Sequence, residues 1–171
     1  MIRMIAACDR DMIIGVDNKL PWKPGAFKGD LAYFKALTEN SVVVMGWNTW
    51  LSLPNKPLSN RVNIVLHHGH REGVYDFHTH LGCGSIDTII NISKHINIWI
   101  IGGASIYKQM MPYADEIIIT MLNASYLLGN PDKKDSVIKF PRIIGDWKTE
   151  ITKHAYNPDF CIHRFIRRND G

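Results

Sequence analysis

The chain has 171 residues, of which 46% are hydrophobic and 21% are charged. This composition predicts one globular domain over residues 1–171 and excludes an intrinsically disordered chain. Lys and Arg number 20 against 16 Asp and Glu, so the net charge is only +4 at pH 7. A surplus this small and scattered suits an anionic small-molecule ligand, and no block of like charge indicates a tail that binds nucleic acid.

The three cysteines, Cys8, Cys83 and Cys161, lie far apart and have no CxxC spacing. This pattern predicts neither a disulfide framework nor a zinc site, so we expect a reducing, cytoplasmic location. The first apolar run stops before Asp9 and lacks the apolar core of a signal peptide. No run approaches the ~18 apolar residues of a membrane helix. We therefore expect a soluble protein that binds no metal, and we also expect a monomer.

Predicted strands and helices alternate along the chain. Short apolar runs predict strands over residues 2–8, 41–45, 61–66, 97–101 and 115–122, with a weak strand over 74–78. Helical spacing of apolar residues predicts helices over 29–38, 47–53, 85–94 and 104–111, the last one ended by Pro112. Residues 9–28 and 123–139 are predicted as loops, and 147–156 with 160–168 as a closing hairpin. This order predicts an α/β fold with a mainly parallel central sheet, helices on both faces and an antiparallel C-terminal hairpin at the edge.

Two strand–glycine–helix junctions are candidate anion sites. Gly102 and Gly103 follow one predicted strand, and Gly46 follows another, with Thr49 in the helix behind it. Glycine lets a phosphate approach the backbone, and the N–H groups of a helix start point toward it. Tight turns of no ligand-binding significance are the alternative, because the GxGxxG fingerprint is absent.

Asp30 begins the helix in which Leu31 and Phe34 are expected to face inward. One interpretation is a carboxylate that stabilises the helix start. The other places Asp30 at the mouth of an apolar cleft, where desolvation raises its pKa and it binds a cationic or amidine-like ring edge. Trp22, in the long loop, either fills the core or lines a site that the loop covers.

Eight short stretches, in order and spacing, resemble the dihydrofolate reductase family from end to end. They are Ile5-Ala6-Ala7, Ile14-Gly15-Val16-Asp17-Asn18, Leu20-Pro21-Trp22, Asp30-Leu31-Ala32-Tyr33-Phe34-Lys35, Val44-Met45-Gly46-Trp47-Asn48-Thr49-Trp50, Arg61-Val62-Asn63-Ile64-Val65-Leu66, Ile100-Ile101-Gly102-Gly103-Ala104-Ser105-Ile106-Tyr107 and Thr120. The resemblance implies the fold of that family and the NADPH-dependent reduction of 7,8-dihydrofolate to 5,6,7,8-tetrahydrofolate. Hydride would go to pterin C6, and N5 would be protonated.

The resemblance also implies roles for four catalytic residues. Asp30 matches the acid that bonds the 2-amino group and N3 of the pterin, and Thr120 would hold Asp30 by a hydrogen bond. Trp22 would hold a water near the carboxylate, and Leu20 would close the loop over the nicotinamide.

Further residues match substrate and cofactor positions of the family. The implied substrate-binding residues are Ile5, Ala7, Asp30, Leu31, Phe34, Leu53, Leu58, Arg61, Ile101 and Thr120. Arg61 would grip the glutamate carboxylate of folate, a bidentate task for which Lys is a poor substitute. The implied cofactor-binding residues are Ala7, Ile14, Gly15, Gly46, Thr49, Gly102, Gly103 and Tyr107. We expect the same site to include Trp47, Asn48, Leu66, His67, His68, Ala104, Ser105 and Ile106.

The chain departs from the family pattern at three places. Residues 23–29 lengthen the approach to Asp30, and Trp47 and Ser105 stand where many bacterial members have arginines near the cofactor phosphates. Our hypothesis is that His67 and His68, with Arg71, meet the 2′-phosphate instead. A solvated, His-rich turn over residues 67–71 is the alternative.

Three rival functions remain open at this point. A pyrimidine or pterin reductase of the same fold would not require Asp30, Phe34 and Arg61 together, and a non-catalytic binding protein would not require Asp30 or Trp22. Nucleic-acid binding would rest on Arg164, Arg167 and Arg168, but their place on the hairpin favours a solvated face instead. His78 and His80 lack a third ligand nearby and are expected at the surface rather than on a metal.

Overall fold

A computed structural model of the chain describes residues 1–17, 19–23, 25–27, 29–67, 74–76, 78, 80–132, 137–153 and 159–168. The strands of this part are β1 (Ile2–Cys8), β2 (Ile13–Val16), β3 (Val42–Gly46), β4 (Val62–Leu66), β5 (Val74–Asp76), β6 (Leu81–Cys83), β7 (Ile98–Gly102), β8 (Glu116–Leu122), β9 (Val137–Lys139), β10 (Trp147–Lys153) and β11 (Phe160–Arg167). The helices are α1 (Asp30–Thr38), α2 (Trp47–Ser52), α3 (Ile86–Ser93), α4 (Ala104–Met110), the 3-10 turn η1 (Met111–Tyr113) and α5 (Tyr126–Gly129).

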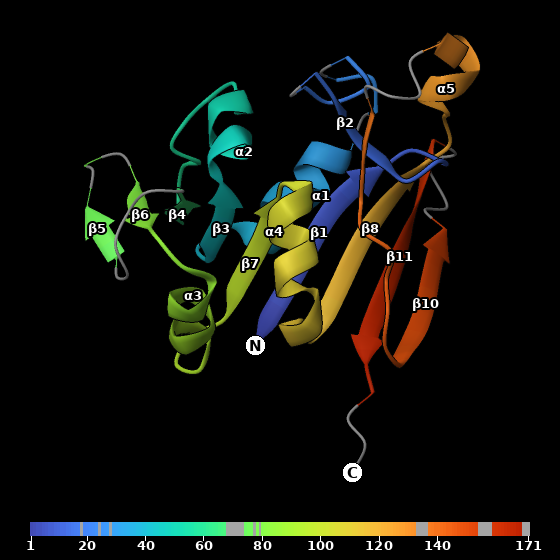
Figure 1. Cartoon of the computed structure of the whole chain (residues 1–171). Helices are drawn as coiled ribbons and strands as arrows, with labels where there is room; N and C mark the ends of the chain where they lie inside the picture. Colours follow the sequence, from blue (N-terminus) through green and yellow to red (C-terminus); the bar gives the residue numbers. More distant parts are fainter. Residues whose placement is uncertain are drawn as a thin grey trace.

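The main sheet has the strand order β10-β11-β8-β1-β7-β3-β4-β6-β5 (Figure 1). Its central pairs, from β8 to β6, are parallel, whereas the pairs made by β10, β11 and β5 are antiparallel. Because parallel strands end at one side, the carboxyl ends of β1, β3 and β7 meet at the top of Figure 1. The predicted α/β architecture, with its mainly parallel sheet and closing antiparallel hairpin, is confirmed.

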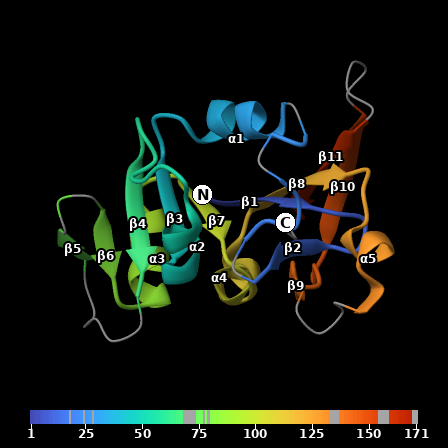
Figure 2. The ribbon, with the colours of Figure 1, turned by 90° about the horizontal axis from the view of Figure 1, so that it is seen from above.

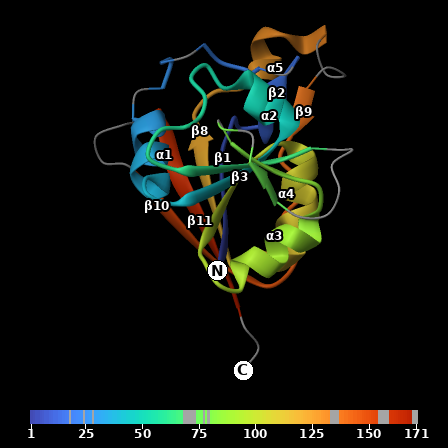
Figure 3. The ribbon, with the colours of Figure 1, turned by 90° about the vertical axis from the view of Figure 1, so that its left-hand side faces the viewer.

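Helices cover both faces of the sheet, and each face has its own apolar core. α1 lies on one face, while α3 and α4 lie on the other (Figures 2 and 3). Alternation along each strand sends neighbouring side chains to opposite faces. In β3, for example, Val43 and Met45 pack in the core beneath α1, and Val44 packs in the core beneath α3 and α4.

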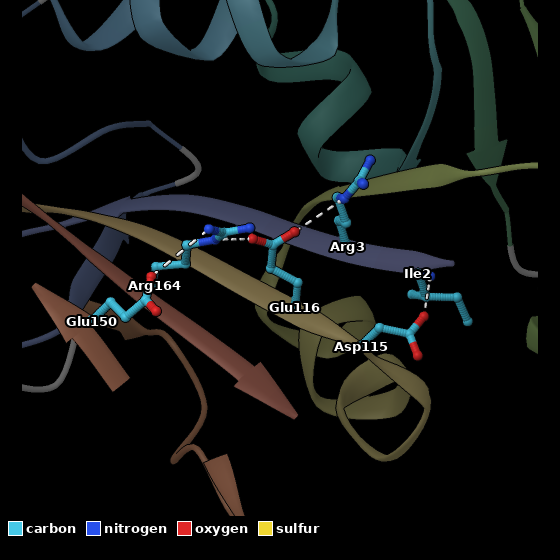
Figure 4. Close-up of polar contacts among 6 residues, drawn as sticks. All are labelled: Ile2, Arg3, Asp115, Glu116, Glu150 and Arg164. Carbon is cyan, nitrogen blue, oxygen red and sulfur yellow. Dashed lines mark hydrogen bonds and ion pairs between the residues drawn. The ribbon is translucent and has the colours of Figure 1, made fainter. Parts of the chain in front are cut away.

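An ion-pair network ties the C-terminal hairpin to the first strand (Figure 4). The Glu116 carboxylate, 7% exposed, accepts a hydrogen bond from Arg3 Nε at 3.0 Å and another from Arg164 Nε. Arg164 also lies 3.8 Å from Glu150 in β10. The Arg164 side chain is 49% exposed, as the prediction of a solvated hairpin face expects, and its charge is also paired with Glu116 and Glu150.

The other two arginines of that stretch also have partners inside the chain. Arg167 donates to the backbone oxygens of Ala114 at 2.7 Å and Met111 at 2.8 Å. Arg168 lies 3.8 Å from Asp146. Both arginines thus have partners within the chain, and Arg168 is exposed, as the predicted solvated face expects.

Two segments predicted as loops contain regular structure. Residues 9–28 include β2, and residues 123–139 include α5 and β9. β2 pairs with β9 more than a hundred residues away, with a register shift between Ile13 and Gly15. A glycine within a bulged strand resembles turn punctuation in the sequence, which is why the loop prediction was wrong there.

Smaller differences concern short elements. The weak strand over 74–78 ends at Asp76, and the three-residue β6 beyond it was not predicted. α4 ends at Met110, just before Pro112 as predicted, and the chain then continues in the 3-10 turn η1, where a proline near the start removes no N–H that the turn needs. The turn expected at 157–159 and the end of the predicted strand at Tyr156 lie outside the described residues, apart from Asp159.

Candidate active site

The two glycine junctions come together at the carboxyl ends of β3 and β7, which are neighbours in the sheet. A Cβ at Gly46 would lie 3.0 Å from Ile106 Cγ1 and 3.8 Å from the Gly103 nitrogen. Gly102 has φ +126°, a conformation that side-chain-bearing residues rarely adopt, and its peptide bond to Gly103 is cis. The chain thus passes closely by itself at both junctions, as only glycine allows.

α2 and α4 begin directly after these glycines, which have no side chain to cap the first N–H groups of either helix. Thr49 Oγ1 lies near both Gly102 and Gly103, because a Cβ at either glycine would meet it at 3.3 Å. The Tyr107 hydroxyl, also beside Gly102, donates a hydrogen bond of 2.7 Å to the Ile5 backbone oxygen. Burial raises the pKa of Tyr107, so this hydroxyl stays protonated and keeps donating.

Asp30 is the first residue of α1, following Gly29 at φ +101°. Its carboxyl accepts a hydrogen bond from Thr120, a 2%-exposed residue of β8. Burial raises the pKa of Asp30, and the Thr120 hydrogen bond offsets part of that rise. The contact reaches across to the sheet instead of to α1 itself, which favours a functional acid over a group that only stabilises the helix start.

An apolar wall adjoins Asp30 on the α1 face of the sheet. The core on that face includes Ile5 and Trp50, with partly buried side chains packed against it, among them Trp22, Phe27, Phe34, Leu53, Leu58 and Ile101. Trp22 and Phe27 meet edge to face, with ring centroids 5.9 Å apart. The structure therefore brings together Trp22 and most of the predicted pterin-wall residues, and adds Phe27, which the sequence analysis did not single out.

Unlike the side chains of the apolar wall, Leu31 and Leu20 are exposed to solvent. Leu31 is 60% exposed, so the expectation that it faces inward is wrong. α1 packs on the sheet through Phe34, Leu37 and the fully buried Thr38, whereas Leu31 in its first turn points to solvent. Leu20 is 52% exposed. Both large apolar side chains therefore border solvent at the end of the sheet where Asp30 lies.

Arg61 is held at the far end of α1. Its Nε donates to the Ser59 backbone oxygen at 2.9 Å, and one terminal nitrogen donates to Thr38 Oγ1 at 3.0 Å. The guanidinium carbon lies 5.8 Å from the centre of the Phe34 ring. Burial lowers the pKa of Arg61, and the nearby Glu39 counteracts this. The guanidinium is thus oriented beside the predicted wall before any carboxylate reaches it.

The segment after β1 is fastened to the protein by Asp9. This carboxyl, 1% exposed, accepts hydrogen bonds from the backbone nitrogens of Asp11, Ile13 and Tyr126 at 2.8–2.9 Å. Ile14 and Gly15 follow in β2, at positions where the resemblance implies cofactor contact. Asp9 was not singled out from the sequence, because its three partners are backbone groups that leave no residue pattern.

A cavity of about 300 Å³ lies where the segment after β2 meets α2. It is lined by Asp17, Lys19, Asn48, Leu51 and Ser52. Of these, only Asn48 was predicted as a site residue. Its helix neighbours Leu51 and Ser52, three and four positions on, share its face, and that spacing was the available signal.

Trp47 and His67 lie against each other beside the Gly46 junction. Their rings meet edge to face with centroids 4.6 Å apart, and Trp47 is 37% exposed. His80 is half-buried, with its ring 4.5 Å from that of Trp50, so the expectation of a surface residue is wrong for His80. A solvated turn does not describe the half-buried His67 either. His68 and Arg71 lie outside the described residues.

The remaining cofactor candidates fall at the same end of the sheet. Ala7 lies in β1 opposite Thr120, Leu66 ends β4, and Ala104, Ser105 and Ile106 form the first turn of α4. Ser105 is exposed, and its Oγ accepts from Gln109 at 3.0 Å. These residues surround the two helix starts, whose N–H donors have the chemistry that a dinucleotide diphosphate needs. The residues present therefore fit a dinucleotide cofactor.

Within the ranges given above, no three His, Cys, Asp or Glu side chains gather as a metal site would require. In the same part of the chain, no helix has the length and apolar character needed to cross a membrane.

Comparison with known proteins gives a consistent result. A family model described as dihydrofolate reductase matches residues 1–158. The chain is 34% identical over 164 residues to the dihydrofolate reductase of Buchnera aphidicola subsp. Acyrthosiphon pisum, covering 92% of each chain, and 35% identical to that of Bacillus subtilis, covering 95% of this chain and 94% of the relative. A solved structure of dihydrofolate reductase from Enterococcus faecalis, complexed with NADP(H) and RAB-propyl, aligns with a TM-score of 0.78 and 26% identity, over 99% of this chain and 97% of that one.

Proposed function

The chain belongs to the dihydrofolate reductase family and catalyses the NADPH-dependent reduction of 7,8-dihydrofolate, and we propose that Asp30 is the acid around which this reaction is arranged. The observation that carries the proposal is the Asp30 carboxyl, held by Thr120 of β8 and bordered by an apolar wall. A carboxylate there binds two adjacent N–H groups of a ring, as the 2-amino group and N3 of a pterin present them.

Each neighbouring residue has a proposed task. Ile5, Phe34 and Ile101 pack against the flat rings and exclude water from the reacting face. Trp22 holds a water beside Asp30 that delivers a proton to N5, and Leu20 covers the site when the loop closes. Reduced nicotinamide supplies the hydride when NADPH is bound. The exposed Leu31 acquires its apolar partner only when substrate is present, which accounts for a large apolar side chain left in solvent.

Arg61 is proposed to bind the glutamate carboxylate of the substrate. Its hydrogen bonds to Thr38 and Ser59 orient the guanidinium in advance, so less conformational entropy is lost on binding. For the cofactor, the N–H groups at the starts of α2 and α4 are proposed to bind the diphosphate. We assign the 2′-phosphate end to Trp47 and His67, with His68 as a further candidate, because this chain has Trp47 and Ser105 where arginines are common.

A cytoplasmic monomer that acts on a small molecule and binds neither nucleic acid nor membrane completes the proposal. The partners of Arg164, Arg167 and Arg168 within the chain support it, because these cations already have intramolecular contacts. Sedimentation at micromolar concentration is expected to give the mass of one chain, and a dimer would contradict the monomer proposal.

The decisive experiment compares two acids that both lie in the first turn of a helix. Asp30→Asn is expected to lower kcat/KM for dihydrofolate by about 100-fold or more, since it removes a charge that binds the reacting ring. Asp87→Asn, in the first turn of α3, is the matched control and should leave turnover unchanged. Oxidation of NADPH in the presence of dihydrofolate is followed by absorbance. Equal activities of the two variants would show that Asp30 only stabilises its helix.

A further inference from the structure

β11 carries a cysteine–histidine pair outside the candidate active site. Cys161 Sγ lies 3.2 Å from His163 Nε2, and both side chains are half-buried. Their neighbours Phe160 and Ile162 pack in the core beneath α1, so alternation along the strand puts Cys161 and His163 on the opposite face of the sheet. β11 runs between β8 and β10 (Figure 1). The thickness of the sheet therefore separates this pair from Asp30.

The surroundings of the pair are mostly apolar. Met121 lies opposite Cys161 in β8, and Ile119 lies opposite His163. In β10, Lys153 lies opposite Cys161 and Ile151 lies opposite His163. Burial lowers the pKa of His163, so its imidazole is neutral at pH 7 and has a ring nitrogen able to accept a proton. A thiol beside a neutral imidazole is the arrangement that produces a nucleophilic thiolate.

The other two cysteines provide a contrast within the same chain. Cys8 and Cys83 are both 0% exposed. Burial and the nearby carboxylates of Asp9 and Asp30 raise the pKa of the Cys8 thiol, and burial also raises that of Cys83. Of the three cysteines, Cys161 is the one that combines access to solvent with a histidine base.

We propose that Cys161 and His163 form a modification site at which Cys161 makes a mixed disulfide with a low-molecular-weight disulfide. His163 Nε2 takes the thiol proton, and Cys161 Sγ attacks one sulfur of the reagent. The reagent S–S bond breaks as the new S–S bond forms, and the departing thiolate recovers the proton from His163. One disulfide is consumed and one is made, so Cys161 is oxidised and half of the reagent is reduced to a thiol.

The test uses oxidised glutathione as the probe on the folded, full-length protein. Intact-mass measurement is expected to show one adduct per chain, and peptide mapping should place it on Cys161. Cys161→Ser should remove the adduct, whereas Cys8 and Cys83 should react only after denaturation. An adduct on Cys8 or Cys83 of the folded protein, or none on Cys161, would overturn the proposal.

The role of His163 is tested by His163→Gln, with His163→Phe as a second variant that keeps the ring volume. At pH 7 either variant is expected to slow the reaction of Cys161 by about tenfold or more. At strongly alkaline pH a thiol no longer needs a base to become a thiolate, and the rates of wild type and variant should converge. Because His163 is outside the proposed active site, unchanged dihydrofolate turnover reports intact folding. A variant with normal turnover and the wild-type rate at pH 7, or a difference that persists at high pH, would exclude His163 as the base.

Discussion

Gly102 offers the sharpest test of how the fold shapes the cofactor end of the site. Gly102→Ala adds one methyl group to a residue at φ +126°, where residues with a Cβ are strained by about 1–3 kcal/mol. That Cβ would lie 3.3 Å from Thr49 Oγ1 and 3.3 Å from the Tyr107 hydroxyl, closer than ordinary van der Waals contact. Tyr107 is 3% exposed and has little room to move. We expect a total loss of about 2–4 kcal/mol in the free energy of unfolding, with backbone strain as the larger part.

Gly102→Ala should also alter the proposed active site. Displacing the Tyr107 hydroxyl weakens its 2.7 Å hydrogen bond to the Ile5 backbone oxygen, and Ile5 belongs to the proposed substrate wall. Urea denaturation measures the stability loss, and thermal denaturation should show about 2–4 °C of lowered Tm per kcal/mol for a domain of this size. The KM for NADPH, measured below the unfolding transition, is expected to rise at least about tenfold.

Two neighbouring substitutions serve as controls. Gly103 has φ −88°, an ordinary value, and its Cβ would meet only Thr49 Oγ1 at 3.3 Å, so Gly103→Ala should cost about 1 kcal/mol or less. Gly129, at the end of α5, has nothing within 4 Å of its Cβ position, and Gly129→Ala should be neutral or slightly stabilising. If Gly102→Ala and Gly103→Ala lose the same stability, the backbone argument is refuted.

Three further predictions concern charged groups. Because burial raises the pKa of Asp30 above its unfolded value, the ionised carboxyl destabilises the fold at neutral pH, and Asp30→Asn should be more stable than wild type at pH 7–8. This gain in stability should vanish below the unfolded pKa of about 4. A gain that grows on acidification would contradict the direction of the pKa shift. Glu116→Gln should lower the free energy of unfolding, measured by urea denaturation, by about 1–3 kcal/mol, because Arg3 and Arg164 both lose their buried counter-ion. Glu150→Gln should cause no resolvable change in that free energy. Arg61→Lys should raise the KM for dihydrofolate about tenfold with little change in kcat, and equal effects on both would indicate a role in turnover.

The local elements of the fold could be predicted because their signals are local. Ile2–Cys8 is a strand in both the prediction and the structure, since six apolar residues, interrupted only by Arg3 and followed by Asp9, leave few alternatives. Ser85 caps the start of α3, one residue before Ile86, and its side chain accepts from the Thr88 nitrogen. β2 and β9 could not be predicted, because each is short and acquires hydrogen-bond partners only from a segment far away in sequence.

The features of the candidate site also separate into those with a local sequence signal and those that depend on distant segments. The glycine junctions could be recognised because glycine at the end of a strand marks a backbone requirement, and they do meet in space. That Asp30 accepts from Thr120 came from the family resemblance, since ninety residues separate them and no spacing rule connects a helix start to a distant strand. Phe27 was missed and Leu31 was wrongly expected to face inward, because both depend on how α1 and the loop before it pack on the sheet, whereas Asp9 was missed because its partners are backbone groups.

The register of the C-terminal hairpin connects the stability of the sheet to the position of Asp30. Glu116, Ile118 and Thr120 alternate along one face of β8, and β11 places Ile162 opposite Thr120. A slip of one residue in β11 would turn Cys161 and His163 toward α1 and Phe160 and Ile162 away from it, which would empty the core beside Thr120. The Glu116–Arg164 pair joins positions that only the observed register brings together on this face. The charge network of Figure 4 therefore stabilises, four residues from Thr120, the strand alignment on which the hydrogen bond to Asp30 depends.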